Sequence, residues 1–290
     1  MASIKELRQR IRSVGSIKQI TRAMEMVATT KLRRFQDRAV GSRPYAQEIA
    51  GLVGRLAGVL GEDVEGLPLF RRGPGLATLA VVVSSDRGLC GPYNSNVFRA
   101  LEAWRAARPE ADVRYLVYGR KAFQYMLRRG YRVERVVQDP PLEKIDYRSA
   151  AIGARVLVRE FLSGAYADVW LLSTRFESMA RYVPQFTQFL PIEAAALGAE
   201  KSAGAGDVIL EPDPRTIFEQ LVPRYLEVRA YNALLESLTS EYASRRLAMK
   251  NATDAATDMI KALRGVYNRK RQEGITRDLL DIVGGVEALK

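Results

Sequence analysis

In residues 4–27, IKELRQRIRSVGSIKQITRAMEMV, the apolar side chains recur every three or four positions. This spacing is close to a heptad and is typical of a helix that packs along one partner helix. Basic side chains occupy the other faces, so the apolar stripe is narrow. We expect a helix whose packing stripe consists of Ile4, Leu7, Ile11, Val14, Ile17, Ile20, Met24 and Val27.

The helical pattern extends well beyond this stripe, to about Leu60. Pro44 is the only proline in that span, and a second run of apolar residues at helical spacing follows it. The helix is therefore expected to continue or to restart after Pro44. Glycines and prolines in residues 61–75 then end the pattern.

The middle of the chain alternates between two kinds of segment. Buried or alternating apolar runs of strand length are separated by amphipathic segments of helix length, which predicts an α/β domain over residues 75–195. The expected strands are residues 76–85, 113–119, 131–138, 167–178 and 185–192, and the expected helices are residues 96–107, 121–130 and 146–164.

The chain returns to helix over residues 212–290, with Asp213 and Pro214 as a start signal. Small alanines on this helix would let another helix approach closely. The simplest arrangement pairs it with residues 1–60 as an antiparallel coiled coil. The expected organisation is thus a helix over 1–60, an α/β domain over 75–195, and a helix over 212–290.

The composition offers few of the residue types that most often serve in catalysis or metal binding. The chain has no histidine and a single cysteine, which removes the commonest general base and makes a structural zinc site improbable. No phosphate-binding G-x-x-x-x-G-K-[ST] string occurs, and no apolar run reaches the length of about 20 residues that spans a bilayer. We expect no catalytic residue, no cofactor and no metal, and a location in the cytoplasm or at the cytoplasmic face of a membrane.

Positive charge is concentrated in two segments at opposite ends of the chain. Residues 1–38 carry ten Lys and Arg against three acids, and residues 245–271 carry eight against two, within a net charge of +12 for the whole chain. Such segments usually meet an acidic protein, nucleic acid or anionic lipid. For residues 31–38, KLRRFQDR, a solvated or acid-facing helix surface is favoured over nucleic-acid binding, because no aromatic residues are interleaved with the basic ones as a motif.

The turn SSDRGLCGPYN, residues 84–94, follows the first expected strand. It lacks the glycine spacing and the lysine of a phosphate cradle, and Cys90 has no histidine to activate it. A strand end leading into a helix, capped by Asn94 or Ser95, is favoured over an interaction surface or a nucleophile, with Cys90 as a packing residue. The acids Asp207, Glu211 and Asp213 could be interpreted as metal ligands. Because their spacing matches no regular ligand pattern, a solvated loop is favoured.

Several stretches resemble the gamma subunit of F-type ATP synthases. They are residues 1–38, the turn SSDRGLCGPYNSNV, and the C-terminal segments SEYASRRLAMKNATDAATDMI and YNRKRQEGITRDLLDIVGGVEAL. The resemblance implies a coiled coil with a Rossmann-like α/β domain. It also implies a non-catalytic rotor shaft that turns inside a ring of alpha and beta subunits, whose acidic loops the basic helices would face.

The resemblance further implies partners and residue roles. The shaft would stand, with an epsilon subunit, on a proton-driven membrane ring of c subunits, at the cytoplasmic face of a bacterial membrane. Positions matching the family's contacts with the alpha and beta ring are Met24, Arg245, Gln272, Thr276 and Asp278, and Glu211 matches the region near the rotor ring. Asp278 stands where the family usually has glutamate, which shortens the carboxylate arm.

Two other classes of function remain open at this point. A coiled-coil protein associated with nucleic acid would use the same positive charge and would bind DNA or RNA in a salt-dependent way. A Rossmann-type enzyme is disfavoured, because the dinucleotide fingerprint G-x-G-x-x-G is absent.

Overall fold

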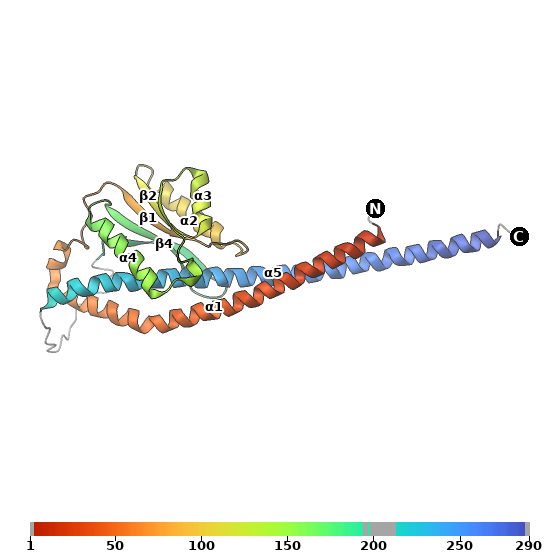
Figure 1. Ribbon diagram of the computed structural model, residues 1–290, viewed down its shortest axis with the longest axis horizontal. Helices are drawn as coiled ribbons and strands as arrows, with labels where there is room; N and C mark the ends of the chain where they lie inside the picture. Colours follow the sequence, from red (N-terminus) through yellow and green to blue (C-terminus); the bar gives the residue numbers. More distant parts are fainter. Residues whose placement is uncertain (1–2, 194–196, 198–212, 288–290) are drawn as a thin grey trace. The chain divides into compact units, whose positions relative to one another are not determined.

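The computed structural model describes residues 3–193, 197 and 213–287 of the 290-residue chain (Figure 1). The chain divides into two compact units. One combines Met1–Thr29 with Arg245–Lys290, and the other is Thr30–Ser244. Each unit is described in turn.

Two long helices supply most of the helical residues. Helix α1 covers Ile4–Leu60 without interruption, so the chain continues through Pro44 rather than restarting. Its start is a capping box, in which the Glu6 amide donates to Ser3 Oγ (3.2 Å) and the Ser3 amide donates to Glu6 Oε2 (2.8 Å). Helix α5 covers Pro214–Glu287, and the Asp213 carboxylate caps it by accepting from the Thr216 amide (2.9 Å), as the start signal predicts.

The unit Thr30–Ser244 contains a five-stranded sheet and its helices. After a 3₁₀ helix, η1 (Gly61–Gly66), the elements follow in the order expected from the sequence. They are β1 (Thr78–Val83), α2 (Tyr93–Ala106), β2 (Val113–Tyr118), α3 (Arg120–Arg129), β3 (Val133–Val137), η2 (Leu142–Lys144), α4 (Tyr147–Leu162), β4 (Asp168–Phe176) and β5 (Tyr182–Leu190).

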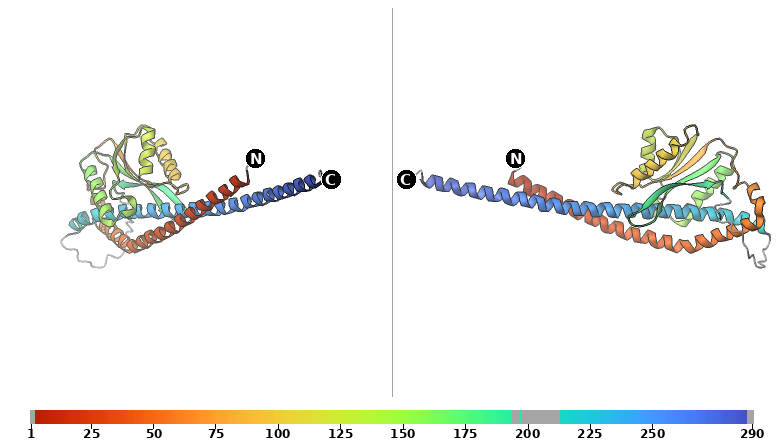
Figure 2. Two further views of the ribbon diagram at one scale, coloured as in Figure 1. Left: turned by 45° about the vertical axis from the view of Figure 1, so that its right-hand side comes forward. Right: turned by 180° about the vertical axis from the view of Figure 1, so that it is seen from behind.

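The strand order is β3-β2-β1-β4-β5, with β5 antiparallel and the other neighbours parallel. Helices α2 and α3 cover one face of the sheet, and α4 and the first part of α5 cover the other (Figures 1 and 2). This is the doubly wound arrangement that right-handed crossovers produce. The expected α/β fold is confirmed.

The core on the α2 and α3 side is aromatic. Trp104 stacks on Phe186 with ring centroids 4.3 Å apart and lies 6.0 Å from Trp170. Tyr93 and Met126 are fully buried in the same cluster. These contacts join both helices to the central strands and to the antiparallel edge strand.

The other unit is a pair of antiparallel helical segments, residues 3–29, which comprise Ser3 and the start of α1, and residues 245–287 of α5. Two contacts set the register: Thr253 Oγ1 donates to Thr21 Oγ1 (2.8 Å), and the Arg8 guanidinium donates to the Tyr267 hydroxyl (3.0 Å). The two segments run side by side in every view (Figures 1 and 2). The antiparallel pairing of the terminal helices is confirmed.

Candidate interface: the terminal helix pair

The turn after β1 is closed by its own hydrogen bonds. The Ser85 and Asn94 side chains bond each other (2.7 Å), and the Asn94 amide also donates to Cys90 Sγ (3.1 Å). Cys90 is buried, as expected of a packing residue. The expected helix cap is wrong: α2 begins at Tyr93, and Asn94 ties the turn to the end of β1 instead.

Helix α5 fills the crevice at the switch point of the sheet, where open α/β folds bind their ligands. The Thr174 amide of β4 donates to Ser237 Oγ (3.0 Å), and Ser244 Oγ donates to the Cys90 carbonyl (2.5 Å). These serines have small side chains, so the helix backbone lies close to the strand ends. The place that a nucleotide takes in a dinucleotide-binding fold is occupied here by the chain itself.

Charged groups tie α1 and α5 to the α/β layers within Thr30–Ser244. Lys31 of α1 pairs with Glu143 of η2 (2.5 Å), and Tyr242 of α5 hydrogen-bonds the same carboxylate. Burial alone would raise the pKa of Glu143, but the hydrogen bonds from Lys31 and Tyr242 outweigh it, so the pKa is lowered. Arg38 donates to the Ile145 carbonyl (2.5 Å). This unit is held together by polar ties as well as by its core.

A buried carboxylate joins α4 to α5. Glu227 is 2% exposed and accepts from Arg155 (2.6 Å) and from the Tyr147 hydroxyl (3.0 Å), with Arg224 at 3.4 Å. Burial would raise the pKa of Glu227, but these donors outweigh it and lower the pKa. The carboxylate is therefore ionised at neutral pH and fixes this contact in place.

The helix pair of the other unit packs along a heptad seam, with more polar residues than the sequence suggests. Buried or half-buried positions recur at steps of four and three on both segments. On α1 they are Leu7, Ile11, Val14, Lys18, Thr21, Glu25 and Ala28, and on α5 they are Met249, Thr253, Ala256, Ile260, Leu263, Tyr267 and Lys270.

The predicted apolar stripe follows this seam only as far as Val14. After Val14 the predicted stripe continues to Ile17 and Ile20, whereas the observed seam continues to Lys18 and Thr21. The predicted positions therefore lie one residue before the buried ones. One residue is about 100° around a helix. Ile17, Ile20 and Val27 are consequently 52%, 59% and 56% exposed, and they lie outside the seam.

Helix α5 extends past the start of α1 in this unit, as Figures 1 and 2 show. The Arg8–Tyr267 contact places residue 271 opposite Ile4, so the rest of α5 has no α1 residue beside it. At about 1.5 Å per residue this single-helix end is roughly 24 Å long. Its exposed apolar side chains are Ile275, Leu279, Leu280, Ile282 and Val283.

The candidate contact residues do not form one cluster. Met24 is half-buried beside the seam, and Arg245 is buried at 7% exposure. Gln272, Thr276 and Asp278 are exposed on the single-helix end. They are spread over roughly 50 Å of helix from Arg245 to Asp278. Glu211 lies outside the described residues.

Other kinds of site find no support among the described residues. Over residues 3–193, 197 and 213–287, no group of His, Cys, Asp and Glu gathers as a metal ion requires. No helix in the described part of the chain is both long enough and apolar enough to cross a bilayer. What distinguishes the helix pair is the number of apolar side chains it leaves exposed, which is typical of a subunit of a larger assembly.

Comparisons with known proteins agree with that class. A family model described as ATP synthase matches residues 3–289. The ATP synthase gamma chain of Cytophaga hutchinsonii is 38% identical, covering 100% of this chain and 99% of that protein. The gamma chain of Mycolicibacterium smegmatis is 41% identical, covering 99% of this chain and 98% of that protein.

Solved structures give the same answer. The central stalk and c-ring structure of Tetrahymena thermophila mitochondrial ATP synthase contains a chain that is 26% identical, with a TM-score of 0.55, covering 80% of this chain and 99% of that one. A chain of the Euglena gracilis mitochondrial enzyme shares the fold at a TM-score of 0.66 and 19% identity, covering 99% of this chain and 94% of that one. This chain belongs to the ATP synthase gamma chain family and is a gamma subunit, the central-stalk rotor.

Proposed function

We propose that the helix pair, residues 3–29 and 245–287, turns inside a ring of alpha and beta subunits that carry the catalytic sites. Each angle of the pair would then stabilise a different conformation of each site, because the contacts differ around its circumference. Proton flow through a membrane ring of c subunits, on which the chain stands together with an epsilon subunit, would drive the rotation. The chain would be held at the cytoplasmic face of a bacterial membrane through this complex.

The exposed apolar side chains of the helix pair carry this proposal. Leu279, Leu280 and Ile282 are 57%, 66% and 64% exposed on a single helix that no other described segment covers. A partner that surrounds the helix would bury them. Nucleic-acid binding explains the positive charge of residues 245–271 but gives no reason for these apolar residues.

We assign the candidate residues to successive levels of the pair. Met24 and Arg245 would act at the end of the pair near Thr29, and Gln272, Thr276 and Asp278 at the single-helix end, all toward the alpha and beta ring. The exposure of Gln272, Thr276 and Asp278 supports this assignment, since each can reach a partner without rearrangement. Glu211 is assigned to the region near the rotor ring. We propose 1–60, 75–195 and 212–290 as the functional division of the chain.

Reconstitution with alpha and beta subunits tests the proposal. Adding this chain is expected to change both assembly and ATPase activity, and unchanged activity would contradict the rotor role in this chain. Leu279→Asp combined with Leu280→Asp should reduce the ATPase activity of the complex several-fold. Neither residue contributes to the folded core, so the free energy of unfolding of the chain alone should change by less than about 0.5 kcal/mol.

A matched control is available on another helix. Leu127 of α3 is 67% exposed, and Leu127→Asp matches the single variant Leu280→Asp, at 66% exposure, in charge and exposure but lies outside the helix pair. That variant should leave the ATPase activity of the complex of alpha, beta and this chain unchanged. Equal losses from both substitutions would mean that the effect is not specific to the single-helix end.

A further inference from the structure

The face of the sheet beneath α4 is incompletely covered over β2 and β3. A pocket of about 540 Å³ lies there. Leu116, Tyr118 and Val136 line it from the strands. Ile145, which follows η2, and Ile152 and Val156 of α4 complete the apolar lining. Its volume is within the range of pockets that bind small molecules, about 300–1,000 Å³.

The winding of the chain explains why this pocket is open. The first two crossovers put α2 and α3 on one face, so the other face has only α4 and α5. Ala230 and Leu234 of α5 pack over Val81, Leu171 and Phe189, on the central strands and β5. The strand ends of β2 and β3 are thus left to α4 alone, at the carboxyl edge where α/β sheets bind ligands.

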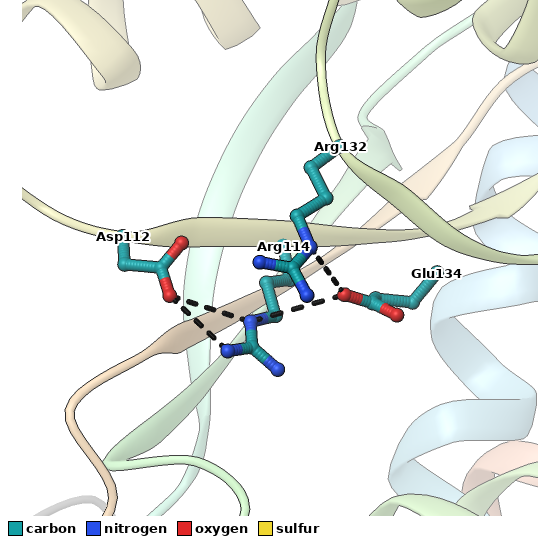
Figure 3. Close-up of polar contacts among 4 residues, drawn as sticks. All are labelled: Asp112, Arg114, Arg132 and Glu134. Atoms are coloured by element: carbon teal, nitrogen blue, oxygen red, sulfur yellow. Dashed lines mark hydrogen bonds and ion pairs between the residues drawn. The ribbon is translucent and has the colours of Figure 1, made fainter.

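Ion pairs link β2 and β3 at the opposite end of these strands. Arg114 donates to Asp112 (3.3 Å) and lies 3.8 Å from Glu134, which also pairs with Arg132 (2.9 Å), as Figure 3 shows. These four side chains satisfy one another across the two strands. A smaller pocket of about 160 Å³ at this end is lined by Glu134, Arg135 and Glu160, each of which is already in an ion pair.

Tyr118 presents a hydroxyl at the pocket. Gly153 of α4 also lines the pocket, and a Cβ placed there would lie 2.6 Å from the Tyr118 hydroxyl, so glycine preserves the space that this oxygen occupies. No hydrogen bond to this hydroxyl is formed by the described residues, unlike the hydroxyls of Tyr125, Tyr131 and Tyr147. Burial raises the pKa of Tyr118, so the group remains a proton donor at neutral pH.

Arg135 of β3 adds positive charge to the same wall. Its guanidinium donates to Glu160 (3.1 Å), and the side chain is 50% exposed and lines the pocket. Asp139, just after the end of β3, also lines the pocket, so the acid group of a ligand would have to bind beside Tyr118 and Arg135 and away from this carboxylate. One part of the pocket therefore combines a hydroxyl donor with a cation, next to apolar walls.

We propose that this pocket binds a small aromatic monoanion. The ring would lie between Leu116, Ile152 and Val156, and the acid group would accept from the Tyr118 hydroxyl and face the Arg135 guanidinium. An anion that gains both a neutral and a charged donor binds more strongly than the matching alcohol. This site is independent of the rotor role, since none of its residues belongs to the helix pair.

The test uses the full chain and 3-phenylpropionate as the probe, followed by saturation-transfer NMR titration. Saturable binding with a Kd of about 1 mM or lower is expected. 3-Phenylpropanol and propionate, which lack the charge and the ring, should each bind at least tenfold more weakly. Binding that does not saturate, or an alcohol that binds as well as the acid, would overturn the proposal.

Three variants locate the binding. Ile152 and Leu162 are both on α4, at 53% and 52% exposure, but only Ile152 lines this pocket. Ile152→Trp should abolish binding by filling the pocket, and Leu162→Trp should leave it unchanged. Tyr118→Phe should weaken binding about tenfold by removing the donor. Equal binding by the wild type and Ile152→Trp would place the probe elsewhere and refute the site.

Discussion

Two parts of helix α5 differ in which side chains they bury and which they expose. Over residues 226–244 it buries polar side chains, among them Ser237, Thr239, Ser240 and Ser244, all at 2% exposure or less. Over residues 257–283 it exposes apolar ones, including Met259, Val266, Leu279 and Leu280 at 48–66%. The same helix is therefore built for two environments, one supplied by this chain and the other by a partner.

The buried hydroxyls are tolerated because each has a partner. Ser240 donates to the Thr174 carbonyl (3.4 Å), and Thr239 donates back to the Leu235 carbonyl (2.8 Å). Buried polar groups are costly only when they are left unpaired. In the exposed part, apolar side chains contribute no hydrophobic stabilisation while they remain in water, and would do so only if another surface covered them.

Two leucines on α5 give the largest expected contrast. Leu235 is fully buried and Leu280 is 66% exposed. Leu235→Ala should lower the free energy of unfolding by about 2–5 kcal/mol, because it leaves a cavity in the core. Leu280→Ala should change it by less than about 0.5 kcal/mol. Urea denaturation of the isolated chain measures both, and similar losses would contradict the contrast.

The buried carboxylate should give the next largest effect. Glu227→Gln removes the charge that Arg155 and Arg224 face, and should cost about 1.5–3 kcal/mol at pH 7, the range for hydrogen bonds to charged groups. Because the pKa of Glu227 is lowered on folding, its contribution is present above the unfolded value of about 4.3 and is lost as pH falls through the folded value.

The pH dependence separates this effect from a general loss of stability. The difference between the wild type and Glu227→Gln should shrink as pH falls from 7 to 3, measured by urea denaturation at each pH. Glu219 pairs with Arg215 at the surface, at 54% exposure, and Glu219→Gln should have little effect at any pH. A difference for Glu227→Gln that stays constant with pH would contradict the assigned role.

Ser237→Ala should have a smaller effect, of about 1–2 kcal/mol. It leaves the buried Thr174 amide without its side-chain acceptor. Ser95 also bonds a backbone carbonyl, but at the surface, so Ser95→Ala should change the free energy of unfolding by less than half as much. Thermal or urea unfolding distinguishes the two, and equal effects would mean that the Ser237 contact adds no stability.

The hydrogen bond between Thr253 and Thr21 should give the smallest effect. Both residues are nearly buried in the seam of the helix pair, at 8% and 9% exposure. Thr253→Val should cost about 1 kcal/mol by removing this bond. The Thr21 hydroxyl then keeps only the Lys18 carbonyl as a partner (3.1 Å), so adding Thr21→Val should cost less than Thr21→Val does alone. Purely additive losses in this double-mutant cycle would show that the hydroxyls are not coupled.

Much of the fold follows from the sequence because periodicity and length are local signals. The expected strand at 76–85 corresponds to β1, and the expected helix at 121–130 lies within one residue of α3. The strand at 185–192 begins three residues earlier, at Tyr182, because its pairing partner on β4 sets its length. The strand order could not be predicted, since it depends on which distant segments pair.

The seam of the helix pair shows where local signals fail. Ile20 and Thr21 are neighbours, and hydrophobicity favours Ile20 for the buried position. The structure buries Thr21 instead, because its hydroxyl finds Thr253 across the seam. Ile20 is left exposed, because the residue that decides the buried position lies 232 positions away and the local sequence does not reveal it. The roles of Met24, Arg245, Gln272, Thr276, Asp278 and Glu211 remain predictions, because contacts with other subunits are not local signals either.

The long separation of these contacts along the chain has a consequence for biosynthesis. Thr21 cannot form its hydrogen bond until Thr253, 232 positions later, has been synthesised. Lys31 is separated from Tyr242 by 211 positions. A ribosome that adds about 5–20 residues per second leaves the first helix without its partner for tens of seconds. The sheet can form in that interval, but its switch-point crevice stays open until α5 emerges. During translation, this protein should therefore be a client for factors that shield apolar helices.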